Sequence, residues 1–412
     1  MAERTTHAVL RMGGRDPDEE HRVSTPLELL FDLTFVIGFG VAADELAHLV
    51  AEGHTREGLI GFSFAVFAVA WAWMFYSWFA SAYDTDDWLF RLLTMLQMVG
   101  VLILALGLPQ MFESLVEGDH VDNGVMVLGY IVMRVPMLLQ WLRATLQDPA
   151  RRRAHVVYMV SIVVSQVLWV GILFAELPVG AMFALVLVPT LIEHGGPVLA
   201  ETRYGGTPWH AHHIAERYGL LVIIALGEGI LGTNVALGAL IEHGWTVDVA
   251  LLGLAGTALP FGIWWTYFVI PHGALLHAHR ERSFGWRYWH LPLFGAVVAV
   301  GAGLHVAAYQ LGEEFELSTR TTVLAVAVPM AVYVATMYVL YAQISRTGDP
   351  FHVLLIAGSA VVVVAALAMA AADVSLVWCL LVLALTPWVT VVGYEAVGHR
   401  HNEEVLESLT RP

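Results

Sequence analysis

The sequence predicts an all-α polytopic membrane protein with about twelve transmembrane helices. Of its 412 residues, 58% are hydrophobic and only 14% are charged, whereas soluble domains carry roughly 25% charged residues. The apolar residues are spread over the whole chain, and the arginines gather in alternate connections between the apolar stretches. These observations indicate a chain that crosses a lipid bilayer many times.

Twelve stretches are long and apolar enough for a transmembrane helix, which needs about 20 residues. They are residues 27–50, 59–80, 88–112, 123–146, 154–176, 178–194, 215–241, 246–270, 289–311, 320–343, 350–372 and 374–397. The sixth stretch is short and contains a proline, so its length is the least secure. Most connections are short, which favours antiparallel neighbouring helices.

Arginine placement predicts the orientation of these spans. With the N-terminus in the cytoplasm, seventeen of the twenty arginines fall on the cytoplasmic side. The opposite side holds only Arg56 and Arg320, and Arg134 lies within the fourth span. Cytoplasmic loops of membrane proteins carry an excess of arginine and lysine. We therefore expect a multi-pass protein with both termini in the cytoplasm.

A weak internal repeat predicts two six-helix halves. The first span opens with Glu28 and the seventh with Glu216, and a Trp-rich span follows each. Six spans per half would make the repeat parallel, although apolar helices also resemble one another by chance. The expected parts are a cytoplasmic segment 1–26, a first half 27–194, a cytoplasmic His-rich loop 195–214, a second half 215–397 and a cytoplasmic tail 398–412.

Composition excludes several classes of protein. The formal net charge of -16 argues against a nucleic-acid partner. All basic residues are arginine, so a retinal protein with a lysine Schiff base is excluded. The single cysteine, Cys379, allows neither an intrachain disulfide nor a cysteine metal cage.

Two carboxylates share one face of the first span, because Glu28 and Asp32 are four residues apart. Charged groups inside a membrane are costly and mark functional sites. Two carboxylates so close would not both ionise unless a cation lay between them. The pair suits proton relay, cation binding or metal ligation. In the alternative reading Glu28 lies in water at the membrane edge and only Asp32 is buried.

A mid-span arginine, Arg134, requires a carboxylate partner, because an unpaired charge there would be very costly. Glu28, Asp32 and Glu228 are the candidates. The sequence leaves open whether the pair is structural or clamps a substrate.

The seventh span begins with a His-rich cluster. Glu216 lies four residues after His212 and three after His213, so either pair can converge on one ion from one helix face. This spacing leaves a divalent metal open as a cofactor. Alternatively, these histidines are solvated at the membrane surface.

Further along this span, Glu228 lies eleven residues after Arg217, which puts both on one face roughly 16 Å apart. Glu228 therefore lies near mid-bilayer, with Asn234 deeper again. A buried glutamate without a partner would hold a proton, which suits a proton carrier. A protonated structural glutamate fits equally.

A weaker candidate is the acidic run Asp84, Asp86 and Asp87 before the third span. Three acids there could bind a cation, although such a run is more often a solvated helix cap. His305 in the ninth span is weaker still.

The chain resembles the bacterial low temperature requirement A (LtrA) family in two segments. The first reads Glu28-Leu29-Leu30-Phe31-Asp32-Leu33-Thr34-Phe35-Val36. The second reads His213-Ile214-Ala215-Glu216-Arg217-Tyr218-Gly219-Leu220, followed by Leu226-Gly227-Glu228. Gly229 departs from the serine that the family often has after the second segment. The resemblance implies an integral protein of the bacterial cytoplasmic membrane linked to growth in the cold, and it supplies no reaction.

Three functions fit these residues. The first is a proton- or cation-coupled transporter of a small solute or ion, in which Glu28, Asp32, Glu216 and Glu228 carry the coupling ion, Arg134 is the counter-charge, and Arg217 and Asn234 lie along the same path. The second is an intramembrane metal-dependent enzyme acting on a lipid or apolar metabolite, with His212, His213 and Glu216 as ligands and Glu28 or Asp32 as the general base. The third is a non-catalytic scaffold or sensor. A homo-oligomer remains open in each case.

Overall fold

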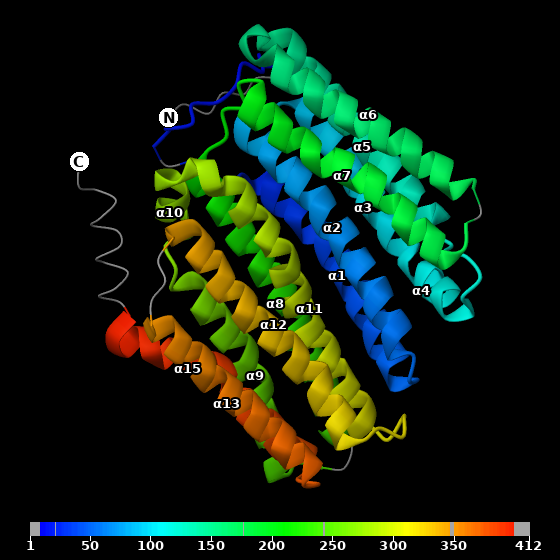
Figure 1. Ribbon diagram of the computed structural model, residues 1–412, viewed down its shortest axis with the longest axis vertical. Helices are drawn as coiled ribbons and strands as arrows, with labels where there is room; N and C mark the ends of the chain where they lie inside the picture. The colour runs from blue at the N-terminus through cyan, green and yellow to red at the C-terminus, as the bar shows by residue number, and fades with distance from the viewer. Residues whose placement is uncertain (1–8, 21, 176, 242–243, 347–349, 399–412) are drawn as a thin grey trace. The chain divides into compact units, whose positions relative to one another are not determined.

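The structure, a computed structural model, describes residues 9–20, 22–175, 177–241, 244–346 and 350–398. These residues form twelve helical segments that are long and apolar enough to cross a membrane, as expected. They contain no β-strand; the single bridge between His120 and Pro178 is isolated. The predicted all-α class and the count of about twelve spans are confirmed (Figure 1).

The first six spans contain seven helices, because the third span bends. The helices are α1 (Pro26–Ala51), α2 (Thr55–Tyr83), α3 (Trp88–Leu106), α4 (Leu108–Glu117), α5 (Gly124–Gln147), α6 (Arg152–Leu173) and α7 (Val179–Arg203). Gly107 separates α3 from α4, and Pro109 follows within the first turn of α4. A Cβ atom on Gly107 would lie 2.7 Å from the backbone nitrogen of Met126, so only glycine fits at this bend.

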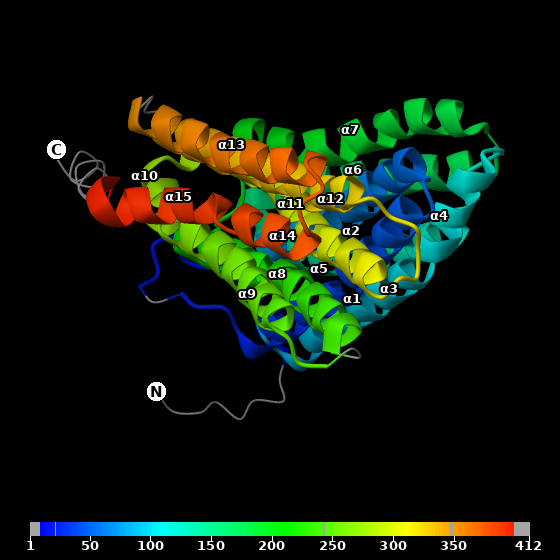
Figure 2. The ribbon, with the colours of Figure 1, turned by 90° about the horizontal axis from the view of Figure 1, so that it is seen from below.

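The last six spans contain eight helices. They are α8 (Ala211–Ile241), α9 (Val247–Phe268), α10 (His272–Ala278), α11 (Ser283–Leu311), α12 (Thr319–Ser345), α13 (Pro350–Ala371), α14 (Leu376–Leu383) and α15 (Thr386–Gly393), which ends in a π-helical turn at Tyr394–Gly398. Helix α11 packs along α12 (Figure 1). Helices α14 and α15 form the last span together and pack against α13 and α9 (Figure 2).

The chain divides into two compact units whose boundary cuts through α1 and α2. The first unit runs to Gly38 and resumes over Ala68–Ile214, and the second comprises Phe39–Phe67 and the chain from Ala215 onward. The parallel repeat expected from the sequence stays a prediction.

Two expected boundaries were wrong by six or more residues, the start of the ninth span, which lies at Ser283 instead of residue 289, and the end of the sixth. The sixth span does not end at residue 194, because α7 continues through Pro189 and Pro197 to Arg203. Transmembrane helices tolerate proline where neighbouring helices satisfy the freed carbonyl groups, and the Ser165 hydroxyl donates to the Pro189 carbonyl at 2.9 Å. The connection expected at 195–214 therefore shortens to residues 204–210.

The segment before α1 is extended and packs against the ends of the first unit's helices. The Leu10 nitrogen donates to Asp87 at 2.9 Å, and the Arg15 nitrogen donates to the Ala82 carbonyl at 2.9 Å. Arg143 of α5 bonds both Asp87 and the Leu10 carbonyl. These contacts fix the polar N-terminal segment beside the end of α2.

Helices α3 and α5 cross at two glycines. A Cβ atom on Gly129 would lie 2.5 Å from the Leu104 nitrogen, and one on Gly100 would lie 2.7 Å from the Gly129 carbonyl oxygen. Small residues allow this close approach of helix backbones in membranes.

Gly129→Ala is expected to destabilise the protein by about 1–3 kcal/mol, since overpacking forces the helices apart. Gly171→Ala in α6 is the matched control, because nothing lies within 4 Å of a Cβ atom there. An alanine in an open helical position instead stabilises by about 0.5–1 kcal/mol. Thermal unfolding of both variants in detergent measures the difference, and equal melting temperatures would contradict the close contact.

Candidate functional site

Glu28 is fixed in the first turn of α1 by a reciprocal cap. The Thr25 nitrogen donates to the Glu28 carboxylate at 2.7 Å, and the Glu28 nitrogen donates to the Thr25 hydroxyl at 3.3 Å. This is the capping box expected for a threonine followed three residues later by glutamate. The Glu28 side chain is fully buried, so the alternative reading that placed it in water is wrong.

Three other ionisable groups meet this carboxylate. Arg22 Nη2 lies 3.3 Å from Glu28 Oε1 and 3.9 Å from Asp84 Oδ2. His213 Nε2 lies 3.2 Å from the Glu28 carboxylate. All four side chains are buried. We call Arg22, Glu28, Asp84 and His213 the Glu28 cluster.

The electrostatics of the Glu28 cluster favour binding one positive charge. Burial, together with the negative charge of Glu28, raises the pKa of Asp84 to about 6, although Arg22 opposes the shift. Burial also lowers the pKa of Arg22, but a guanidinium stays protonated in proteins. With both carboxylates ionised and His213 neutral, the four groups sum to one negative charge. A proton or a small cation would neutralise it.

Asp32 lies one turn after Glu28 and is also buried. Trp73 Nε1 of α2 donates to Asp32 Oδ1 at 2.6 Å. The spacing of four residues does place both carboxylates on a buried face of α1. In this hydrogen bond, however, Asp32 accepts from a neutral indole and not from a positively charged side chain.

A second buried carboxylate, Glu228 of α8, lies in the second unit and is 2% exposed. Glycine backbones line it on two sides. A Cβ atom on Gly40 would lie 3.2 Å from Glu228 Oε1, and one on Gly301 would lie 2.6 Å from Glu228 Cβ. Because neither glycine carries a side chain, α1 and α11 both approach this carboxylate closely.

Glu228 interacts electrostatically with His305 and with Asp44. His305 Nδ1 lies 2.7 Å from Asp44 Oδ1, and the Asp44 side chain is 62% exposed whereas that of His305 is 12% exposed. His305 also lies against the next turn of α8, since a Cβ atom on Gly232 would be 2.6 Å from its Cδ2. We call Asp44, His305 and Glu228 the Glu228 series. It comprises an exposed carboxylate, a histidine that pairs with it, and a buried carboxylate that interacts electrostatically with both.

The partner of Arg134 is Glu193 of α7, and none of the three predicted candidates. Arg134 Nη2 lies 2.5 Å from Glu193 Oε1, and both side chains are buried. The guanidinium also lies 4.6 Å from the ring centre of Phe75 and 5.2 Å from that of Tyr130. The expectation of a buried carboxylate partner was correct, and its identity was wrong because helix adjacency cannot be inferred from α5 alone.

The metal ligands predicted at the start of α8 differ in their exposure. His213 is fully buried, whereas His212 and Glu216 are exposed. Within the described part of the chain, no group of three or more His, Cys, Asp or Glu side chains is arranged to hold a metal ion. Arg217 is buried like Glu228, as their shared stripe predicts, and Asn234 is exposed.

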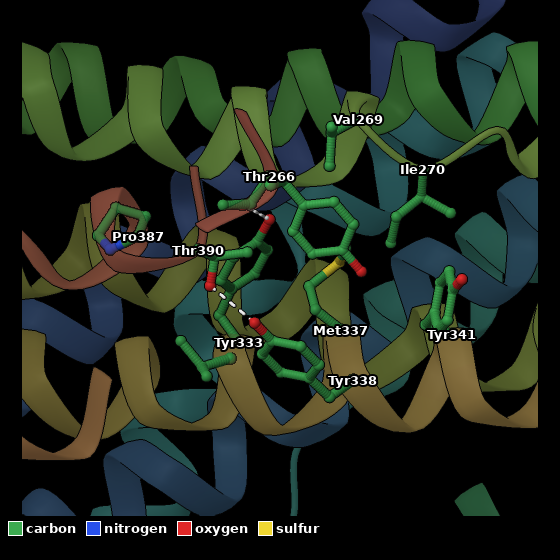
Figure 3. Close-up of a pocket in the computed structure, with 11 residues that line it drawn as sticks. Thr266, Val269, Ile270, Tyr333, Met337, Tyr338, Tyr341, Pro387 and Thr390 are labelled. Carbon is green, nitrogen blue, oxygen red and sulfur yellow. Dashed lines mark hydrogen bonds between the residues drawn. The ribbon is translucent and has the colours of Figure 1, made fainter. Parts of the chain in front are cut away.

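A small cavity of about 20 Å³ lies between α9, α12 and α15 (Figure 3). Hydroxyl groups on its wall pair with one another: Thr266 with Tyr333 at 2.7 Å, and Tyr338 with Thr390 at 2.9 Å. This volume suits about one water molecule. Because its lining is neutral, this cavity is less suited to bind an ion than the Glu28 cluster or the Glu228 series.

Sequence reasoning missed Arg22, Asp44 and Glu193 and undervalued Asp84 and His305. Each had a signal. Thr25-Pro26-Leu27-Glu28 is a capping-box pattern that brings the preceding segment to the site. Glu193 and Asp44 are acids within apolar spans, and such acids require partners.

Comparison with known proteins agrees with the fold. The family described as bacterial low temperature requirement A protein matches residues 23–386. An uncharacterized protein of Rhizobium meliloti (strain 1021) is 28% identical over 335 residues, with 76% of each chain covered. The residues 23–386 that match the family model span the Glu28 cluster from Val23 onward and the Glu228 series.

Proposed function

The chain belongs to the bacterial low temperature requirement A family, and for this multi-span membrane protein we propose a proton- or cation-coupled transporter of a small solute. The Glu28 cluster and the Glu228 series are the proposed sites of the coupling ion. Neither the family description nor the relative supplies a solute.

The observation that carries this proposal is the sharing of Arg22 by two buried carboxylates, Glu28 and Asp84, beside His213. A purely structural ion pair needs one carboxylate for each cation. Here two buried carboxylates lie beside one Arg22 guanidinium and a histidine, an arrangement that can take up a proton or another cation. Such an excess of buried acid is typical of proton relays in pumps and transporters.

In the proposed chemistry, the Glu28 cluster takes up the coupling ion at one place and the Glu228 series at another. The coupling ion, a proton or a small cation, moves between the carboxylates of Asp84 and Glu28. The positive charge of Arg22 offsets one of the two negative charges that remain when the ion leaves. In the Glu228 series, His305 passes a proton between exposed Asp44 and buried Glu228. Histidine suits this role because its ordinary pKa lies near neutrality.

The first test is an infrared titration of carboxyl protonation in the purified protein. Because the pKa of Asp84 is raised to about 6, its protonated fraction falls as pH rises through that value. We expect a carboxyl band that disappears with a midpoint near pH 6 and that is missing in Asp84→Asn. In Glu28→Gln the midpoint moves to lower pH, since the negative charge of Glu28 raises the pKa of Asp84.

The matched control is Asp119→Asn, which changes an exposed carboxylate and leaves the band unchanged. Replacing choline with sodium in the buffer distinguishes the coupling ions. A midpoint lowered by sodium identifies a cation that competes with the proton, and an unaffected midpoint identifies the proton. If the band near pH 6 survives in Asp84→Asn, the assignment of the Glu28 cluster is wrong.

A further inference from the structure

A long groove of about 680 Å³ lies within the second unit. Its walls come from residues 46–50 of α1, 55–67 of α2, 291–306 of α11 and 321–332 of α12. All four segments belong to membrane-spanning helices. This volume is in the range of pockets that bind small organic molecules, and no residue of the Glu228 series lines it.

The lining of the groove is apolar, and no charged side chain contributes to it. Small residues of α11, including Gly295, Ala299 and Gly303, hollow it out. The Ser63 hydroxyl, one of three on the wall, already donates to the Leu59 carbonyl at 2.7 Å. An apolar surface of this kind offers van der Waals contact but few hydrogen bonds, so it favours a hydrocarbon ligand over a polar one.

The groove is elongated along the helices. The lining of α11 extends from Leu291 to Val306, which corresponds to about 22 Å at 1.5 Å per residue. The hydrocarbon core of a bilayer is about 30 Å thick. A groove that covers most of this depth matches an extended chain better than a compact solute.

Two arginines lie next to one end of the groove. Arg56 follows the lining residue Thr55 at the start of α2, and Arg320 precedes the lining residue Thr321 at the start of α12. Both side chains are exposed, and neither forms an ion pair with another described residue. Glu52 nearby is already paired with His48 at 3.3 Å. Guanidinium groups bind phosphate well.

We propose that the groove binds one membrane phospholipid, with an acyl chain along α11 and the phosphate beside Arg56 and Arg320. Its lining residues Leu59 and Val328 are exposed on membrane-spanning helices, so we expect its occupant to come from the bilayer itself. The lipid fills space that would otherwise leave the small residues of α11 without van der Waals partners.

The first experiment needs no variant. The wild-type protein is reconstituted with phosphatidylglycerol that carries a diazirine on its acyl chain, irradiated, digested and mapped by mass spectrometry. We expect adducts at groove residues such as Val328 to be at least tenfold more frequent than at Val361 of α13, although Val361 is more exposed (68% against 54%). Equal labelling of the two valines would overturn the proposal, as would cross-links between two copies of the chain through the groove.

The second experiment compares the same substitution at these two valines. Val328→Trp fills the groove and should lower the phospholipid retained after detergent extraction at least tenfold, whereas Val361→Trp should leave it unchanged. Arg56→Gln combined with Arg320→Gln should reduce the preference for phosphatidylglycerol over a neutral diacylglycerol. Retention that is unchanged in Val328→Trp, with normal thermal unfolding, would also overturn the proposal.

Discussion

Glu228→Gln is expected to remove the part of the charge movement after a pH step in proteoliposomes that belongs to the Glu228 series. In wild-type protein a drop in pH outside protonates buried carboxylates, which displaces charge within the membrane and gives a transient current on a solid-supported membrane. Glutamine has almost the same shape as glutamate and cannot bind this proton. We expect the displaced charge to fall to the part that the Glu28 cluster contributes, because Glu228 is the buried carboxylate of the Glu228 series.

The matched control for Glu228→Gln is Asp373→Asn. Asp373 is exposed between α13 and α14, and its left-handed backbone conformation (φ 57°) suits asparagine. His305→Gln should slow the current without abolishing the total charge, since it removes the group that we propose carries the proton between Asp44 and Glu228. A full-sized current in Glu228→Gln would exclude this carboxylate as the site of the coupling ion.

Glu193→Gln is expected to cost about 3–5 kcal/mol of stability, the cost of breaking a buried ion pair by removal of one partner. The two partners are not equivalent. Arg134 cannot lose its proton and would remain charged within the membrane, where the Phe75 and Tyr130 rings compensate the charge in part. Arg134→Gln should cost less, because the abandoned Glu193 can bind a proton and become neutral.

Chemical unfolding of both single variants and of the double variant in detergent measures this asymmetry. The double variant Arg134→Gln/Glu193→Gln should be more stable than Glu193→Gln alone, since no charge remains. The exposed pair Arg91–Asp86, at 2.8 Å with both side chains solvated, is the control: Asp86→Asn should cost less than about 1 kcal/mol. Equal losses at the two pairs would mean that water reaches Arg134.

The number and bounds of the spans could be predicted from the sequence because hydropathy and length are local properties. The first span was expected at 27–50 and is found at Pro26–Ala51, and the eleventh was expected at 350–372 and is found at Pro350–Ala371. The sixth was predicted too short, because Pro189 and Pro197 look like helix ends in sequence but lie inside α7. Whether a proline ends a helix depends on neighbours that satisfy the freed carbonyl.

The candidate site could be predicted only in part. The burial of Glu28, Asp32 and Glu228 followed from their positions in apolar helices. Their partners did not, since a charge in a low-dielectric interior pairs with whichever helix packs beside it. The pairing of Arg134 with Glu193 depends on the contact between helices that are not consecutive in the chain.

The Glu28 cluster draws Arg22 from the segment before the first span. A hydropathy plot classifies this segment as a hydrophilic leader and assigns it no role in the membrane domain. The structure makes it part of the Glu28 cluster, because its arginine faces two carboxylates. The buried charge network therefore begins before the first span: the apolar helix begins at Pro26, while the network begins at Arg22.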